Sequence, residues 1–199
     1  MQRPPMYEIL RKYIDERTSA PLTEEGFALL QQAFTHKKLR KKQYLLQEGD
    51  VCKHLSFIIK GALRQFSVDE KGIERIVRFG IEQWWMADRE SFEMNTPSGY
   101  NIEALEDSEV LGITHSALQQ LKEQVPVMKE MTQELDKRSY FASQKRIHAA
   151  ISYTAEERYL DLMKTYPVFL QRFPQNMIAS YLGISPETLS RIRKQALSK

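Results

Sequence analysis

The spacing of apolar positions changes twice along the chain. In residues 6–15 and 23–35, apolar side chains recur at helical spacing, which predicts two amphipathic helices. From about residue 36 to 113, short apolar segments are separated by glycines, which is typical of strands and tight turns. Beyond residue 115 the helical spacing returns. This order predicts an α+β chain in which a small β-roll of the jelly-roll kind lies between helical segments.

The strand prediction depends on three segments in particular. Apolar residues alternate over 55–59, and a glycine follows closely. Residues 62–68 and 73–79 flank the turn sequence Asp69-Glu70-Lys71-Gly72, which is typical of a hairpin. Several short strands with turn signals between them indicate a roll rather than an open sheet.

Residues 126–151 are predicted to form one long helix. Its apolar positions at a spacing near 3.5 residues are Met128, Met131, Leu135, Ala142 and Ala149. Such a seam is typical of a helix that pairs with a second copy. The alternative is a helix packed against its own β-roll, and we favour the pairing helix, hence a homodimer.

The last quarter of the chain contains the pattern of two short helices joined by a tight turn. Ile178 and Leu182 share one face of the first helix, and Leu189 and Ile192 share one face of the second. Gly183 between them adopts a positive φ at little cost, which suits a helix end. The pattern predicts a helix-turn-helix, a motif that places its second helix in the major groove of DNA.

The start of the second helix carries further signals. Ser185 is an N-cap residue, and Pro186 at the first helical position needs no hydrogen bond for its nitrogen. We expect Glu187, Thr188 and Arg191 to contact base edges from the opposite face. Residues expected to contact phosphates are polar or basic: Gln175, Ser180, Ser185, Arg193, Lys194 and Lys199. The alternative is an ordinary amphipathic helix whose basic residues stabilise its C-terminal end.

Charge and composition narrow the function. Residues 145–199 hold nine Lys/Arg and four Asp/Glu, a net charge of +5, whereas the whole chain carries +3. The basic part coincides with the predicted DNA reader, as attraction to phosphates requires. The single cysteine, Cys52, allows no disulfide within one chain, and no signal peptide or membrane span is visible, so we expect a cytoplasmic protein.

Catalytic chemistry has little support in the sequence. The four histidines lack metal-ligand spacing, and the eight glycines form no phosphate-binding loop. We therefore expect no enzyme activity, no metal and no cofactor. A metal-dependent β-roll enzyme remains a minor alternative.

Two stretches of the chain closely resemble the Crp/Fnr family of bacterial transcription regulators. One is Ala155-Glu156-Glu157-Arg158-Tyr159-Leu160 with Tyr166-Pro167, and the other runs from Ile178 to Lys194. The resemblance implies a sensor roll of the cyclic nucleotide-binding type over 1–125, a dimerisation helix over 126–151, and a winged helix-turn-helix over 152–199. It also implies double-stranded DNA and RNA polymerase as partners.

The chain departs from this family where cyclic-nucleotide-binding members hold the ligand. Those members use a Gly-Glu pair and, further on, an Arg followed by Ser or Thr. Here the two regions read Trp84-Trp85-Met86-Ala87-Asp88 and Pro97-Ser98-Gly99-Tyr100-Asn101, without an arginine to pair with a phosphate. We therefore expect no response to cyclic AMP. An unidentified effector could use a pocket formed by Trp84, Trp85, Asp88, Ser98, Tyr100 and Asn101.

The tryptophan pair has an alternative interpretation, because such residues are more often packed in a core than exposed in a sensor pocket. A second departure from the family is Pro186, which stands where many members carry a base-contacting arginine. We therefore expect a different preferred DNA sequence. The function predicted from the sequence is sequence-specific DNA binding, and the alternative is a ligand-sensing or protein-interaction roll that does not read DNA.

Overall fold

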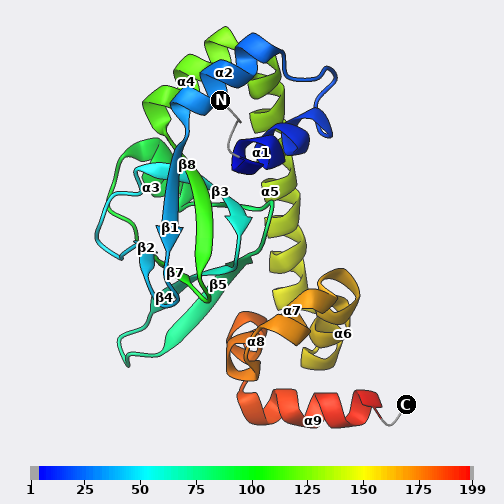
Figure 1. The fold of residues 1–199 in the computed structure, drawn as a ribbon. Helices are drawn as coiled ribbons and strands as arrows, with labels where there is room; N and C mark the ends of the chain where they lie inside the picture. Colours follow the sequence, from blue (N-terminus) through cyan, green and yellow to red (C-terminus); the bar gives the residue numbers. More distant parts are fainter. Residues whose placement is uncertain (1–4, 198–199) are drawn as a thin grey trace. The chain divides into compact units, whose positions relative to one another are not determined.

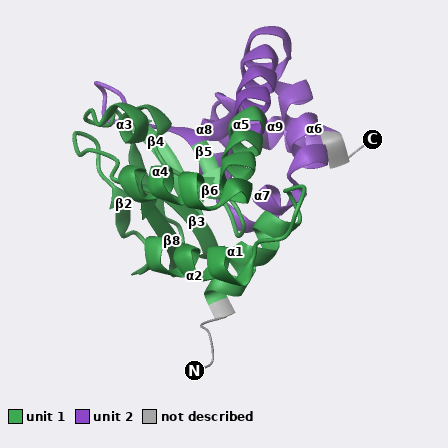
Figure 2. Cartoon of the chain, turned by 90° about the horizontal axis from the view of Figure 1, so that it is seen from above, with its two compact units in different colours: residues 1–67, 78–137 green, residues 68–77, 138–199 purple. Residues whose placement is uncertain are grey.

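The computed structural model describes residues 5–197, and side chains over 6–195. The chain forms two compact units (Figure 2). Unit 1 comprises residues 1–67 and 78–137, and unit 2 comprises 68–77 and 138–199. These boundaries fall inside the long helix and inside a hairpin, whereas the sequence suggested divisions at the ends of that helix.

Unit 1 contains two four-stranded antiparallel sheets, to which the hairpin shared with unit 2 contributes. The strands are β1 (Thr35–Leu39), β2 (Tyr44–Leu46), β3 (His54–Lys60), β4 (Leu63–Val68), β5 (Glu74–Gly80), β6 (Trp85–Met86), β7 (Asn101–Ala104) and β8 (Ser108–Thr114). One sheet has the order β1-β8-β3-β6 and the other β2-β7-β4-β5 (Figure 1). The prediction of an α+β chain built on a β-roll is confirmed.

Four helices complete unit 1 together with the start of a fifth. They are α1 (Pro5–Asp15), α2 (Glu24–Ala33), α3 (Arg89–Met94) and α4 (His115–Gln124). The Thr23 hydroxyl caps α2 by accepting the N–H of Gly26, as expected of a threonine ahead of two glutamates. The ring of Phe57 on β3 lies 5.0 Å from the ring of Tyr13 on α1 and 5.0 Å from that of Trp85. This aromatic cluster fixes α1 against one face of the β1-β8-β3-β6 sheet.

The long helix α5 (Pro126–Ser152) differs along its length. Met128 and Met131 are buried in the core of unit 1, and Leu135 packs against that core. The first part of the helix therefore packs against its own roll, which was the alternative to pairing with a second copy. Beyond residue 137 the helix belongs to unit 2.

Unit 2 is helical apart from the hairpin tip, residues 68–77. Its helices after α5 are α6 (Ala155–Thr165), α7 (Pro167–Arg172), α8 (Gln175–Leu182) and α9 (Pro186–Leu197). Thr154 and Glu157 form a capping box at the start of α6, and the backbone N–H of Thr154 lowers the pKa of Glu157. Pro167 begins α7 directly after α6 has ended, because proline cannot continue a helix. The residues described on either side of α8 and α9 include no wing strands, so the structure describes the helix-turn-helix without the wing that the resemblance implied.

The small core of unit 2 comes from all four of these helices. The buried apolar residues of this helical part are Tyr159, Leu162, Phe169, Phe173, Ile178, Ala179, Leu182, Leu189 and Ile192, and Ile76 of the hairpin tip is buried as well. The four apolar positions predicted to face inward from the helix-turn-helix are all among them. No helix in residues 5–197 is both long enough and apolar enough to cross a membrane.

Candidate functional site

The turn between α8 and α9 is held by backbone hydrogen bonds. Gly183 has φ 68° and ψ 35°, the left-handed conformation expected of a glycine that ends a helix. Its N–H donates to the backbone carbonyl of Ser180, and the N–H of Ile184 donates to the carbonyl of Ala179, each at 3.0 Å. These bonds satisfy carbonyls that the end of α8 leaves free, and they fix the direction in which α9 leaves.

Helix α9 begins as the sequence predicts. The Ser185 hydroxyl accepts the N–H of Thr188 at 3.2 Å, and Pro186 is the first helical residue. A hydrogen bond with the Ser185 side chain lowers the pKa of Glu187, so this carboxylate is ionised at neutral pH. The first turn of α9 therefore presents a carboxylate and two hydroxyls near one another.

The base-reading residues predicted on α9 lie on its accessible side. Glu187 and Arg191 are exposed and Thr188 is half-buried, whereas Leu189 and Ile192 are buried beneath them. A guanidinium nitrogen of Arg191 lies 3.4 Å from the Thr188 hydroxyl. Within the described part of unit 2, nothing covers the predicted face, so a large partner can reach it. Burial of Arg191 and Thr188 would have contradicted the prediction, and it is not observed.

The predicted phosphate contacts divide into three groups. Gln175, Ser185 and Lys194 are exposed, and Arg193 is half-buried. Ser180 is half-buried, and its hydroxyl is already bonded to the hairpin tip: it accepts the N–H of Ile76 and donates to the carbonyl of Glu74, each at 3.0 Å. Lys199 lies outside the described residues.

Two arginines that the sequence did not single out position the helix-turn-helix within unit 2. Arg146 on α5 donates to the carbonyls of Ile76 and Tyr181, at 3.2 and 3.3 Å, and lies over the ring of Tyr181. Arg158 on α6 donates to the carbonyl of Leu182, the last residue of α8, at 3.1 Å. A cation at a helix C-terminus is favourable because carbonyls there lack partners. The signal for Arg158 was its place in the stretch that resembles the family.

The residues proposed for an effector pocket are held in other roles. Trp85 is buried in the aromatic cluster with Phe57 and Tyr13, and Trp84 packs half-buried against the same core. The Asp88 carboxylate caps α3 by accepting the N–H groups of Glu90 and Ser91. These side chains thereby stabilise unit 1.

The second region is bonded to the first. The Ser98 hydroxyl donates to the Asp88 carboxylate at 2.7 Å and accepts the N–H of Tyr100 at 3.0 Å. The side-chain oxygen of Asn101 accepts the N–H of Glu48 at 3.0 Å. The structure thus brings Asp88 and Ser98 together, but their polar atoms bind one another and nearby backbone.

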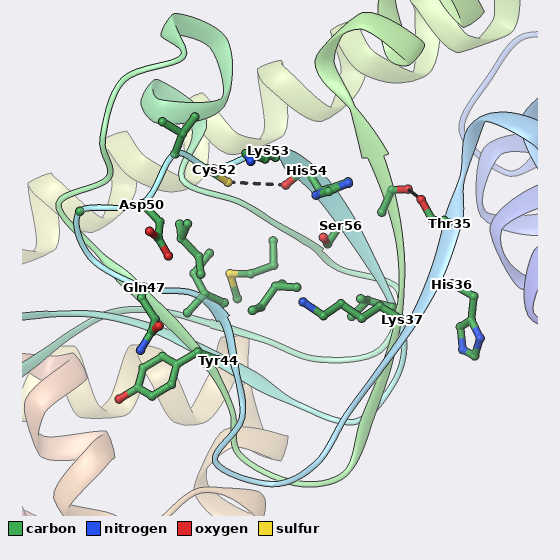
Figure 3. Close-up of a pocket in the computed structure, with 18 residues that line it drawn as sticks. Thr35, His36, Lys37, Tyr44, Gln47, Asp50, Cys52, Lys53, His54 and Ser56 are labelled. Carbon is green, nitrogen blue, oxygen red and sulfur yellow. Dashed lines mark hydrogen bonds between the residues drawn. The ribbon is translucent and has the colours of Figure 1, made fainter.

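A cavity of about 830 Å³ lies elsewhere in the roll, between its two sheets (Figure 3). None of the six residues proposed for the effector pocket is among the residues that line it. Its polar lining includes Lys37 on β1 and His54 and Ser56 on β3, which the sequence did not single out as a group because the two strands are distant along the chain. In the part of the chain that the structure describes, no three His, Cys, Asp or Glu residues are grouped to hold a metal ion.

Comparison with known proteins agrees with this architecture. The cyclic nucleotide-binding domain family matches residues 36–125, which run from β1 to the end of α4. The transcriptional activator protein Anr of Pseudomonas aeruginosa is 25% identical over 171 residues, covering 78% of this chain and 68% of the relative. The fumarate and nitrate reduction regulatory protein of Vibrio cholerae is 26% identical over 185 residues, covering 86% and 72%. The structure of FixK2 from Bradyrhizobium japonicum superposes with a TM-score of 0.62 at 19% identity, over 83% of this chain and 85% of that one.

A cyclic nucleotide-binding-like roll, a long helix and a C-terminal helix-turn-helix follow one another in this chain, and the two relatives are named a transcriptional activator and a regulatory protein. The chain is thus similar, over most of its length, to transcription regulators of the Crp/Fnr kind.

Proposed function

We propose that a homodimer of this chain recognises a specific sequence in double-stranded DNA through α9, with Arg191, Thr188 and Glu187 reading bases in the major groove. The observation that carries the proposal is the accessible face of α9 above buried Leu189 and Ile192. An arginine can donate two hydrogen bonds to guanine, a glutamate can accept from cytosine, and a threonine methyl can contact thymine. The three side chains thus supply chemistry for several different bases.

The charge of the C-terminal region favours the same partner. Residues 145–199 carry a net charge of +5. Exposed Gln175, Ser185 and Lys194 supply donors for phosphates at the rim of the motif, and half-buried Arg193 supplies a further cation. Binding through such contacts releases counterions, so we expect the affinity for DNA to fall steeply as salt concentration rises.

The second half of α5 supplies a surface for the second copy. Tyr140, Phe141, Ile147 and Ile151 are 60%, 60%, 52% and 80% exposed, respectively. Ile147 follows Tyr140 by seven residues and Ile151 follows it by eleven, so the three side chains share one side of the helix. A stripe of large apolar side chains in water is unfavourable, and pairing with the same stripe of a second copy removes it from water.

This stripe lies on the side of α5 opposite the seam inferred from the sequence. At 100° per residue, Ala142 and Ala149 point away from Ile147 and Ile151. The proposed dimer therefore uses the same helix as predicted but a different face of it.

In vitro selection from random DNA duplexes tests the proposal. We expect an enriched inverted repeat whose half-sites are separated by about 34 Å, one helical turn, because a two-fold dimer presents two copies of α9. Selection with a dimeric protein at low salt that enriches no sequence would contradict it and favour a roll that does not read DNA.

We further propose that this regulator is active without cyclic AMP. No arginine lies between Pro97 and Asn101, and the Asp88 carboxylate is already bound by α3 and Ser98. An unpaired phosphate in a pocket is unfavourable. Calorimetry that detects micromolar binding of cyclic AMP would contradict this.

Action on promoters would take place in the cytoplasm, with RNA polymerase as the further partner.

A further inference from the structure

The cavity in the β-roll has two kinds of wall. The β1-β8-β3-β6 sheet contributes residues from its inner face, and β2 and β7 contribute Leu46 and Ile102 from the other sheet. Its volume of about 830 Å³ is within the range of pockets that hold small molecules. Part of the lining is apolar, so a ligand with a hydrocarbon portion would fit it.

The strand register aligns the polar lining in rows across one sheet. Thr35 pairs with Gly112, Gly112 pairs with Ser56, and Ser56 pairs with Met86. In the next row Lys37 pairs with Val110, which pairs with Ile58. Because side chains alternate along a strand, Thr35 and Lys37 share the inner face, whereas His36 and Lys38 face the other side. Beside Gly112 in the first row lies the side chain of His54, whose atoms come within 3.4–3.6 Å of where a Cβ would be.

Ser56 is the most telling residue of this lining. Its side chain is 99% buried, at a relative exposure of 1%, and its hydroxyl has no hydrogen-bond partner among the described residues. A buried hydroxyl without a partner is unfavourable, and natural proteins rarely leave one. Because Ser56 lines the cavity, a ligand in the cavity would supply the missing partner (Figure 3).

Lys37 adds a positive charge to the same space. Its side chain extends into the cavity from β1 (Figure 3). Lys53 and His54 also belong to the lining, and Asp50 is the acidic residue among them. His36 lines the edge of the cavity but turns away from its centre and binds Glu109 at 2.8 Å. Burial lowers the pKa of His54, and the charges of Lys37 and Lys53 lower it further, which shows a positive local potential.

We propose that this cavity binds a small organic anion with a hydrocarbon portion, whose acidic group is held by the Lys37 ammonium and the Ser56 hydroxyl. The hydrocarbon portion would contact Leu46, Ile102 and Met86. No lining residue of this site belongs to the Asp88 and Ser98 region, where the family resemblance places an effector, but the two regions adjoin, because the backbones of Gly49 and Asp50 in the lining are hydrogen-bonded to the backbone of Ser98. The proposal does not depend on DNA recognition by α9.

Isothermal titration calorimetry on the full chain tests the site with four probes of the same hydrocarbon length: hexanoate, hexyl phosphate, hexanol and hexylamine. We expect at least one of the two anions to bind with a Kd below about 1 mM, and the alcohol and the amine to bind at least about tenfold more weakly. Comparison of hexanoate with hexyl phosphate identifies whether the site prefers a carboxylate or a phosphate.

Two substitutions and a matched control localise the binding. Lys37→Gln should lower the affinity for the preferred anion by about tenfold or more, because it removes the positive charge that pairs with the anion. Lys38→Gln removes the same charge one residue away, on the opposite side of β1, and should leave the affinity unchanged. Ser56→Ala should weaken binding without lowering the melting temperature of the free protein, because the hydroxyl that it removes has no partner there.

Three results would overturn the proposal. One is equal binding of hexanol and the anions, which would show an apolar cavity without selectivity. Another is an affinity that Lys37→Gln and Lys38→Gln change equally, and the third is the absence of binding by either anion. Normal DNA binding by the Lys37→Gln variant would show that any loss is confined to the cavity.

Discussion

The hydroxyl of Ser180 accepts a hydrogen bond from the backbone N–H of Ile76 at 3.0 Å, although 104 residues separate the two positions. The same hydroxyl donates to the carbonyl of Glu74, and Arg146 donates to the carbonyl of Ile76. The first helix of the helix-turn-helix is therefore braced by the hairpin tip inside unit 2. The serine that local spacing suggested as a phosphate contact acts here as a structural link.

We expect Ser180→Ala to loosen this link. The Ile76 amide loses its acceptor, so its hydrogen exchange should become faster, by the equivalent of about 1–3 kcal/mol if it stays buried. Amide exchange measured by NMR or mass spectrometry reports this directly. Ser190→Ala on exposed α9 is the control, and equal exchange at Ile76 in both variants would show that the contact does not persist in solution.

Replacing Arg191 should affect the choice of base as well as affinity. Arg191→Ala should weaken binding to the selected sequence by about 1–3 kcal/mol and relax the preference at one base position. Lys194→Ala is the comparison, because a phosphate contact should weaken binding to selected and random duplexes alike. Equal losses on both kinds of duplex for Arg191→Ala would mean that Arg191 also contacts only phosphate.

Gly183→Ala should destabilise unit 2 through its backbone. Nothing lies within 4 Å of an added Cβ, so the effect comes from the φ of 68°, at which a side chain costs about 1–2 kcal/mol. Urea denaturation measures the free energy of unfolding. Gly99→Ala is a suitable control because it has equal space and no positive φ, and equal stability of the two variants would show that α9 leaves the turn with a different backbone conformation.

A single charge on the exposed stripe of α5 should dissociate the dimer. Ile147→Glu places a carboxylate in the proposed interface, where burial is unfavourable. Sedimentation velocity should then show monomers at concentrations at which the unmodified chain is dimeric. Ala142→Glu adds the same charge on the opposite face, and dissociation by this variant alone would restore the seam inferred from spacing.

His54 should titrate below its ordinary pKa of 6.5. Burial and the charges of Lys37 and Lys53 disfavour the protonated imidazole in the folded state, whereas the unfolded chain takes up the proton normally. The His54 contribution to stability is therefore fully present above pH 6.5 and decreases as the pH falls below it. NMR titration of the imidazole checks this, and Lys37→Gln should raise the pKa. A His54 pKa at or above 6.5 would contradict a positive potential in the cavity.

The sequence by itself determined the helix-turn-helix, because its signals act over a few residues. Gly183 ends α8, Ser185 and Pro186 begin α9, and the apolar residues at helical spacing select the buried face. The alternation of the strands and the turn at Gly72 depend on similarly local preferences, so the roll was predictable as a class of fold.

Only the tertiary structure decided which surfaces and polar groups are left free. Lys37 and Ser56 come from strands joined through β8, so their common cavity depends on register rather than on spacing in the chain. Asp88 looked available in the sequence, but a helix start and Ser98 use its carboxylate. Helical periodicity identified α5, but it could not reveal which of two apolar faces the rest of the chain covers. Long-range packing settles such choices, since each depends on partners that are distant in sequence and adjacent only in the fold.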